Sequence, residues 1–272
     1  MKSRILTALV LFPPVIYLIG WSPIWLFLAA VVATVELSLY EYFQICRNGG
    51  VKTFPVVGYV GGVAMCLAQT AALYMPMNPT LAVLGLTVLL TLSLGLRGSA
   101  DLKEYLQAVS STVFGILYVG FTLSCLLPLR FSDRARGQKL IFLLFLVIWA
   151  GDICAYFVGR SLGRHLLSPR VSPKKTIEGA VAGLAGSLLT AWAFAHWFWP
   201  TADLRTIILL AGLIAIAGQI GDLAESAMKR GAGMKDSGAI LPGHGGMLDR
   251  IDGLLFGAQT LWLLLMLKDW PL

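Results

Sequence analysis

Long apolar runs separated by short polar segments dominate this chain. Nine of them lie at residues 5–20, 23–44, 55–74, 80–96, 107–128, 139–159, 177–199, 205–223 and 253–268. About 20 apolar residues suffice for a helix to cross a bilayer. The pattern therefore predicts an all-α, polytopic integral membrane protein with about nine transmembrane helices. The expected range is eight to ten, because only residues 21–22 separate the first two runs.

Composition supports the membrane class. Hydrophobic residues make up 57% of the chain and charged residues only 13%, about half the charged share of an ordinary soluble domain. We therefore expect one membrane domain over 1–272. The net charge of +7 is typical of a membrane protein, and no basic stretch belongs to a soluble fold, so no nucleic-acid partner is expected. The four dispersed cysteines predict buried, unpaired thiols.

The distribution of Lys and Arg predicts a cytoplasmic N-terminus. With nine spans, 15 of the 21 basic residues fall on the side of the N-terminus and 6 on the other, and an excess of Lys and Arg marks the cytoplasmic side. The loop from Arg130 to Lys139 is the exception, because its basic residues fall outside. The two richest polar loops, 160–176 and 224–252, then both face the cytoplasm.

The segment from Ser226 to Asp252 concentrates chemically active residues between two apolar runs. It reads Ser-Ala-Met-Lys-Arg-Gly-Ala-Gly-Met-Lys-Asp-Ser-Gly-Ala-Ile-Leu-Pro-Gly-His-Gly-Gly-Met-Leu-Asp-Arg-Ile-Asp. Glycine lets backbone N–H groups approach a ligand, Lys and Arg neutralise phosphate, and Asp holds divalent cations. The segment therefore predicts a site for phosphate chemistry at a membrane surface.

A second polar segment, Ser172-Pro-Lys-Lys-Thr-Ile-Glu-Gly179, stands directly before an apolar run. Thr176 and Glu178 both suit the N-terminus of the helix that follows. Two interpretations stay open for Lys174 and Lys175. They flank a membrane helix on its cytoplasmic side, or they form a phosphate site together with the helix N-terminus.

Carboxylates at membrane depth are the third signal. Asp152 lies near the end of an apolar run, where a charge faces either a polar cavity or a partner such as Arg160 or Arg164. If the helix that begins near residue 205 continues, one of its faces carries Asp222, Glu225, Ser226 and Lys229. A closed glycine-rich loop would bring Asp222 and Asp249 to one cation, because these residues bracket the loop.

At these positions the chain resembles the bacterial phosphatidate cytidylyltransferase family, also called CDP-diacylglycerol synthases. The matching C-terminal positions are Ser226, Lys229, Arg230, Lys235, Asp236, Gly238, Pro242, Gly243, His244, Gly245, Gly246, Asp249, Arg250 and Asp252. The segments Asp152–Arg160 and Ser172–Gly179 are also similar to the family. Gly253 departs from it, since a Ser commonly follows the last Asp.

The resemblance implies that CTP and phosphatidate give CDP-diacylglycerol and pyrophosphate, in membrane phospholipid biosynthesis. It also implies Mg²⁺, with a second cation such as K⁺ beside it. It implies a multi-pass protein of the bacterial inner membrane, an active site facing the cytoplasm, and a homodimer. We expect the helices in 1–135 to serve packing, lipid contact and oligomer contact, and those in 139–268 to carry the catalytic motifs.

Roles for individual residues follow from their chemistry. Asp222 and Asp249 are the first candidates for metal ligands, followed by Asp252 and Asp152. Candidates for phosphate binding are Lys174, Lys175, Lys229, Arg230 and Lys235. Further substrate contacts are expected from Ser172, Thr176, Glu178, Ser226, Asp236, Gly245, Gly246 and Arg250. His244 has two interpretations, a structural hydrogen-bonding residue or a catalytic acid or base.

Several rival functions compete with this hypothesis. A secondary transporter would show broken helices in two symmetric halves, whereas the polar residues crowd into the C-terminal half. A CTP-dependent lipid kinase is a nearer rival, since it would release CDP and transfer the γ-phosphoryl group. A CDP-alcohol phosphotransferase would need an Asp-Gly-x-x-Ala-Arg pattern, which the sequence lacks. A structural scaffold would leave the polar segments without a role.

Overall fold

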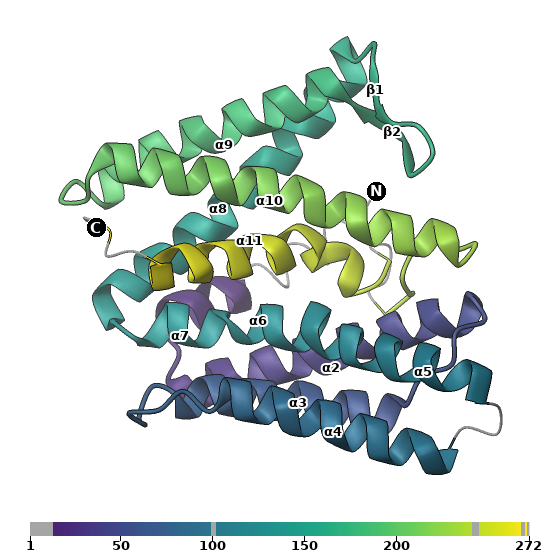
Figure 1. The fold of residues 1–272 in the computed structure, drawn as a ribbon. Coiled ribbons are helices and arrows are strands. Elements are labelled where there is room, and N and C mark those ends of the chain that lie inside the picture. The colour runs from purple at the N-terminus through teal and green to yellow at the C-terminus, as the bar shows by residue number, and fades with distance from the viewer. Residues whose placement is uncertain (1–12, 99–101, 241–244, 268–269, 271) are drawn as a thin grey trace. The chain divides into compact units, whose positions relative to one another are not determined.

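The computed structural model describes residues 13–98, 102–240, 245–267, 270 and 272. The chain forms two compact units (Figure 1). The first unit consists of Met1–Ser132 and Met228–Ile251, and the second consists of Asp133–Ala227 and Asp252–Leu272. The glycine-rich segment near the C-terminus therefore belongs with the N-terminal helices, although about 100 residues of the second unit precede it.

Most of the helices of the first unit pack around α3. They are α2 (Ile24–Asn48), α3 (Pro55–Ala71), α4 (Thr80–Gly98), α5 (Leu102–Gly115), the π-helix η1 (Ile116–Phe121), α6 (Thr122–Ser124) and α7 (Leu126–Phe131). Pro55 suits the first position of α3, where its missing N–H costs no helical hydrogen bond. Gly62 of α3 meets Gly120 of η1, where an added Cβ would lie only 3.1 Å from the Gly62 Cα. The paired glycines therefore let the two helices approach closely.

Arg130 of α7 lies inside the first unit and explains part of the charge distribution that the sequence left unexplained. Its side chain is 5% exposed. Nε donates to the Ile19 carbonyl at 2.6 Å, and a terminal nitrogen donates to the Gly20 carbonyl at 2.9 Å. These carbonyls end the helix at residues 13–20, where a cation is favourable. Arg130 thus serves an internal contact and carries little information about which side its loop occupies.

The second unit consists of four long helices and one small hairpin. Its elements are α8 (Arg134–Leu162), β1 (Leu166–Ser168), β2 (Ser172–Thr176), α9 (Ile177–Phe198), most of α10 (Leu204–Gly231) and most of α11 (Leu248–Leu267). β1 and β2 are antiparallel, with Leu166 opposite Thr176 and Ser168 opposite Ser172. The hairpin connects α8 to α9, which lie side by side (Figure 1).

Small residues allow α8 and α9 to pack closely. The Ser187 hydroxyl donates to the Val147 carbonyl at 2.7 Å. A Cβ on Gly183 would stand 2.9 Å from the carbonyl oxygen of Gly151. Small side chains and interhelical hydrogen bonds are the usual contacts between helices in membranes. They hold the base of the hairpin, and therefore Lys174 and Lys175, on a packed pair of helices.

The all-α membrane class agrees with the structure, but the count of nine spans is not confirmed. Six described helices are long and apolar enough to cross a membrane. The helices in the runs at 55–74 and 80–96 are shorter apolar helices and do not meet this length. α3, for example, has 17 residues. Much of the run at 5–20 lies outside the described residues. α3 is shorter than its apolar run, because it ends at Ala71 and residues 72–79 form turns and bends.

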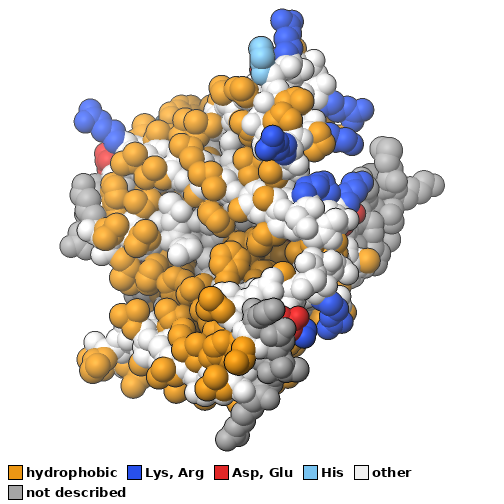
Figure 2. Space-filling view, turned by 45° about the vertical axis from the view of Figure 1, so that its right-hand side comes forward, with side chains coloured by type: hydrophobic (Ala, Val, Ile, Leu, Met, Phe, Trp, Pro, Cys, Tyr) orange, Lys and Arg blue, Asp and Glu red, His pale blue; other side chains and the backbone are white. Residues whose placement is uncertain are grey.

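Hydrophobic side chains cover much of the surface in view (Figure 2). Leu81 is 80% exposed and Val56 is 74% exposed. Exposed apolar surface of this extent is expected where helices contact lipid. The four cysteines form no disulfide, and Cys46, Cys66 and Cys125 are buried, as predicted.

Candidate active site

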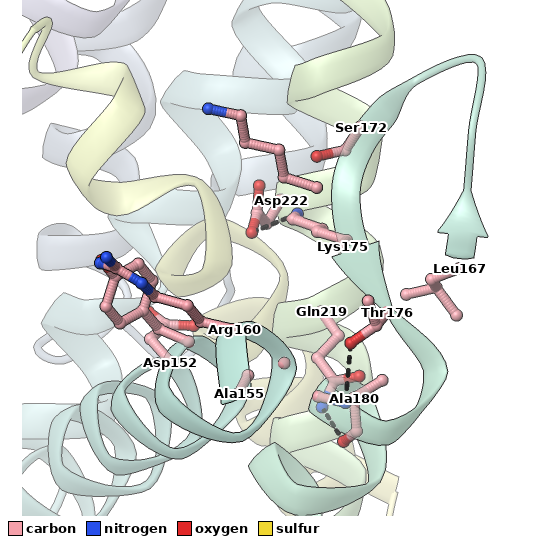
Figure 3. Close-up of a pocket in the computed structure, with 14 residues that line it drawn as sticks. Asp152, Ala155, Arg160, Leu167, Ser172, Lys175, Thr176, Ala180, Gln219 and Asp222 are labelled. Atoms are coloured by element: carbon pink, nitrogen blue, oxygen red, sulfur yellow. Dashed lines mark hydrogen bonds and ion pairs between the residues drawn. The ribbon is translucent and has the colours of Figure 1, made fainter. Parts of the chain in front are cut away.

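A cavity of about 690 Å³ opens in the second unit between α8, the hairpin, α9 and α10 (Figure 3). Its volume lies within the range of ligand pockets. The lining residues are Asp152, Ala155, Tyr156, Gly159, Arg160, Leu167, Ser172, Lys174, Lys175, Thr176, Gly179, Ala180, Gln219 and Asp222. The structure therefore brings Asp152, the segment from Ser172 to Thr176, and Asp222 to one pocket.

Lys175 and Asp222 form an ion pair across this pocket. Figure 3 shows the two side chains directed toward each other, Lys175 from β2 and Asp222 from α10. Their side chains are 29% and 32% exposed. The Ser226 hydroxyl lies 3.5 Å from Asp222 Oδ1, one helical turn away. Half-buried charges of both signs in a cavity can exchange their partner for the phosphate or cation of a ligand, at less cost than fully buried charges.

The N-terminus of α9 faces the same pocket. Thr176 caps this helix, since its hydroxyl accepts a hydrogen bond from the Gly179 N–H at 3.1 Å. The predicted N-cap is thereby confirmed. A Cβ on Gly159 or on Gly179 would stand 3.0 Å from the Thr176 hydroxyl oxygen, so α8 passes close to the cap. The remaining N–H groups of this helix end favour an anion.

Glu178 braces the hairpin and is not among the lining residues. Its carboxylate accepts hydrogen bonds from the backbone N–H groups of Arg164 at 3.1 Å and of His165 at 3.2 Å. It also lies 2.6 Å from His165 Nδ1. The carboxylate thus ties the end of α8 to the start of α9. Substrate binding by Glu178 stays a prediction.

Gln219 is a pocket residue that the sequence interpretation missed. Its Nε2 donates to the Ala180 carbonyl at 3.0 Å and links α10 to α9 (Figure 3). An amide inside the apolar run at 205–223, three residues before Asp222, is the signal that would have revealed it. Arg160 donates to the Tyr156 hydroxyl at 2.9 Å. The predicted pairing of Asp152 with Arg160 or Arg164 stays a prediction.

Acidic side chains gather beside the pocket. Asp252 lies within electrostatic range of Asp222, Glu225 and Asp152, all of the second unit. Among the described residues, no group of three or more His, Cys, Asp or Glu surrounds one metal position. Mg²⁺ needs only one or two protein carboxylates, because water and substrate phosphates complete its shell. The partly exposed Asp222 carboxylate in this acidic surrounding fits that requirement.

Described residues of the glycine-rich segment form a second polar centre, in the first unit. Lys229 Nζ lies 2.5 Å from Asp249 Oδ1, and both side chains are less than 10% exposed. Asp249 Oδ2 accepts hydrogen bonds from the backbone N–H groups of Ser237 and Gly246, each at 2.9 Å. Both oxygens of Asp249 therefore have protein partners. The predicted meeting of Asp222 and Asp249 at one cation stays a prediction.

Glu41 of α2 also contacts this segment, and the sequence interpretation missed it. The carboxylate is fully buried. It accepts hydrogen bonds from the Ser237 hydroxyl at 2.8 Å, the Met247 N–H at 2.9 Å and the Leu248 N–H at 2.8 Å. An acidic residue inside the apolar run at 23–44 is a signal of function or pairing. The sequence pattern predicts only packing, lipid contact and oligomer contact for that run.

Most of the remaining predicted site residues are exposed, and His244 lies outside the described residues. The exposed ones are Lys174, Arg230, Lys235, Asp236 and Arg250. Arg230 donates to the Met234 carbonyl at 2.8 Å. Gly245 has a φ of +81°, which favours glycine. His244 lies outside the described residues, so both interpretations of its role stay predictions. α10 continues to Gly231, which confirms the helix that places Asp222, Glu225, Ser226 and Lys229 on one face.

Comparisons with known proteins show what this chain is similar to. A sequence model described as the cytidylyltransferase family matches residues 2–268. A protein named phosphatidate cytidylyltransferase from Synechocystis sp. is 34% identical over 270 residues, covering 88% of this chain and 87% of its own length. The protein of that name from Bacillus subtilis is 32% identical, with 98% of both chains covered. The one from Brucella suis is 48% identical over 156 residues, covering 55% of this chain and 54% of its own.

Proposed function

This chain belongs to the cytidylyltransferase family, and we propose that it transfers CMP from CTP to phosphatidate, giving CDP-diacylglycerol and pyrophosphate. The names of its relatives, phosphatidate cytidylyltransferases, support this substrate pair. The observation that carries the proposal is the pocket in the second unit, which unites Lys174, Lys175 and the N-terminus of α9 with Asp222. Cations and helix N–H groups suit a triphosphate, and a partly exposed carboxylate suits its metal ion.

The proposed reaction is an in-line displacement at the α-phosphorus of CTP. An oxygen of the phosphatidate phosphate forms the new P–O bond. The bond to the bridging oxygen between α- and β-phosphorus breaks, and pyrophosphate leaves with that electron pair. The attacking oxygen is already anionic at neutral pH, so no general base is required. Catalysis then depends on positioning and on neutralising charge.

The chain's own residues supply both contributions. Lys175 exchanges Asp222 for a phosphate oxygen, and Lys174 adds a second charge at the same strand. Thr176 keeps the start of α9 in its helical form, with its N–H groups directed at the anion. Asp222 would hold Mg²⁺, which neutralises triphosphate charge when bound. A second cation such as K⁺ belongs to the same proposal.

The cellular setting is also part of the proposal. The apolar helices keep the acyl chains of the substrate in the bilayer while its headgroup reaches the polar pocket. We place the pocket on the cytoplasmic side of a bacterial inner membrane, since CTP is a soluble cytoplasmic nucleotide. Phospholipid biosynthesis then consumes the product. A homodimer is expected from the resemblance.

Two labelled substrates test the reaction. Purified protein in detergent receives phosphatidate, Mg²⁺ and CTP carrying label at either the α- or the γ-phosphate. Entry of α-label into lipid, with γ-label released in pyrophosphate, supports CMP transfer. Entry of γ-label into lipid with accumulation of CDP would identify a lipid kinase and overturn the proposal. No transfer of either label, with K⁺ also supplied, would overturn it as well.

A further inference from the structure

We propose that Glu41 is a positioning residue for CMP transfer, because its buried carboxylate holds Ser237 and the start of α11. Its partners belong to a loop whose described residues are 232–240 and 245–249. This inference rests on the proposed function for its activity readout. Glu41 lies on α2, 196 residues before its nearest loop partner in the sequence. It belongs to the same compact unit as the loop.

Glu41 caps α11 from a different helix. α11 begins at Leu248, and Glu41 accepts hydrogen bonds from the N–H groups of Met247 and Leu248. N–H groups at a helix start have no partner within their own helix. A carboxylate satisfies them and interacts favourably with the positive end of the helix dipole. The start of α11 is therefore fixed by a residue of α2.

Ser237 joins the two carboxylates of this centre. Its hydroxyl donates to Glu41 Oε2, and its backbone N–H donates to Asp249 Oδ2. Asp249 Oδ2 also accepts from the Gly246 N–H. Glu41 thus holds Ser237 and the start of α11. Asp249 holds Ser237 and Gly246, which lies before α11. Loss of the Glu41 carboxylate removes three hydrogen bonds, those from Ser237, Met247 and Leu248.

Glu41 also explains two of the loop glycines. A Cβ on Gly246 would lie 2.4 Å from Glu41 Oε2 and 2.1 Å from the Ser237 hydroxyl oxygen. A Cβ on Gly238 would lie 2.6 Å from Glu41 Oε1. Real Cβ atoms do not approach other atoms so closely. The glycines at 238 and 246 therefore make room for the Glu41 carboxylate as well as for any ligand.

The contacts link Glu41 to charged groups of the predicted site. Asp249 pairs with Lys229 through Oδ1, while its Oδ2 accepts hydrogen bonds from the Ser237 and Gly246 N–H groups. A displacement of this loop therefore moves both charges. Misplacement of a positioned group by about 1 Å can cost about 100-fold in rate.

The decisive variant is Glu41→Gln, which keeps the size but turns one acceptor oxygen into a donor. Glu36→Gln is the matched control, since Glu36 lies on the same helix and its Oε1 has no hydrogen-bond partner among the described residues. We expect kcat per folded molecule to fall at least ~10-fold in Glu41→Gln and to stay within about 2-fold in the control. A purely structural role would lower the melting temperature and yield but leave kcat per folded molecule unchanged. That outcome overturns the inference.

A second readout does not depend on activity. Lys235 is exposed two residues before Ser237, and we expect trypsin to cleave after it faster once Ser237 loses its contact with Glu41. Faster cleavage in Glu41→Gln than in Glu36→Gln supports the inference, and equal rates contradict it. If the wild-type chain transfers no CMP, the proposed function fails, while the cleavage rates still test the contact. If Glu41→Gln does not fold, Gly246→Ala perturbs the same contact from the loop side, and wild-type kcat in that variant contradicts the inference.

Discussion

The Lys229–Asp249 ion pair provides the sharpest test of how the glycine-rich segment is held. Lys229→Met removes the cation but keeps a long apolar side chain. Asp249 then retains two backbone N–H donors but loses its charged partner in a site that is 7% exposed. Breaking a buried pair on one side costs about 3–5 kcal/mol, because the remaining charge is left uncompensated. We expect the free energy of unfolding to fall by that amount.

A double-mutant cycle of Lys229→Met and Asp249→Asn measures the interaction energy of the ion pair. Asp249→Asn alone also leaves a buried charge, on Lys229, and should cost a similar amount. The double variant leaves neither charge, so its loss should be smaller than the sum by at least ~2 kcal/mol. The measurement is SDS-induced unfolding in dodecyl maltoside, followed by tryptophan fluorescence. Strictly additive losses would refute the buried-pair interpretation.

The CMP-transfer activity of the same variants tests a second prediction. We expect Asp249→Asn to lower CMP transfer at least ~100-fold, as expected for the loss of an electrostatic group. Near-normal turnover in correctly inserted Asp249→Asn would show that Asp249 holds neither a metal ion nor the reactive loop. A full loss of turnover in Lys229→Met with normal unfolding would instead favour a direct phosphate contact.

Three further predictions concern other sites. Asp222→Asn keeps the size of the side chain but removes its charge, and it should lower CMP transfer about 100-fold. A change under 3-fold in the labelled-CTP assay would show that the Asp222 charge is not needed for transfer. Gly245→Ala should lower the free energy of unfolding by about 1–3 kcal/mol, because φ is +81°, whereas Gly231→Ala, with open space around it, should leave it unchanged or higher. Hydrogen bonds from Thr206 lower the pKa of Asp203 at the start of α10. Its stabilising contribution is therefore present above the ordinary Asp pKa of about 3.9 and is lost as pH falls through the folded-state value. Melting temperatures between pH 6 and 2.5 should show this loss in the wild type and a smaller one in Asp203→Asn.

Local patterns predicted the helices and part of the pocket. The apolar runs located the described helices, and the position of Thr176 before a run predicted its cap, because both depend on neighbours in sequence. The grouping of Lys174 and Lys175 with a helix N-terminus was also local. The β-hairpin before α9 was missed, since three- and five-residue strands leave no period-2 signal.

Long-range polar contacts could not be predicted in the same way. The sequence around Glu41 does not predict that its partners are Ser237, Met247 and Leu248. Arg130 was interpreted as a loop charge, because its contacts with the carbonyls of Ile19 and Gly20 lie more than 100 residues away. A polar residue in an apolar run indicates that a polar partner exists. The identity of that partner depends on the fold.

The distance in sequence between Glu41 and its partners also sets an order of events during synthesis. A ribosome adding about 5–20 residues per second needs roughly 10–40 s to cover the 196 positions from Glu41 to Ser237. Throughout that time α2 carries a carboxylate whose three hydrogen-bond donors do not yet exist. A carboxylate without donors is costly to bury in a membrane, so we expect α2 to reach its final packing only after Ser237, Met247 and Leu248 have been added. Chains truncated before Ser237 would therefore lack all three of these donors to Glu41.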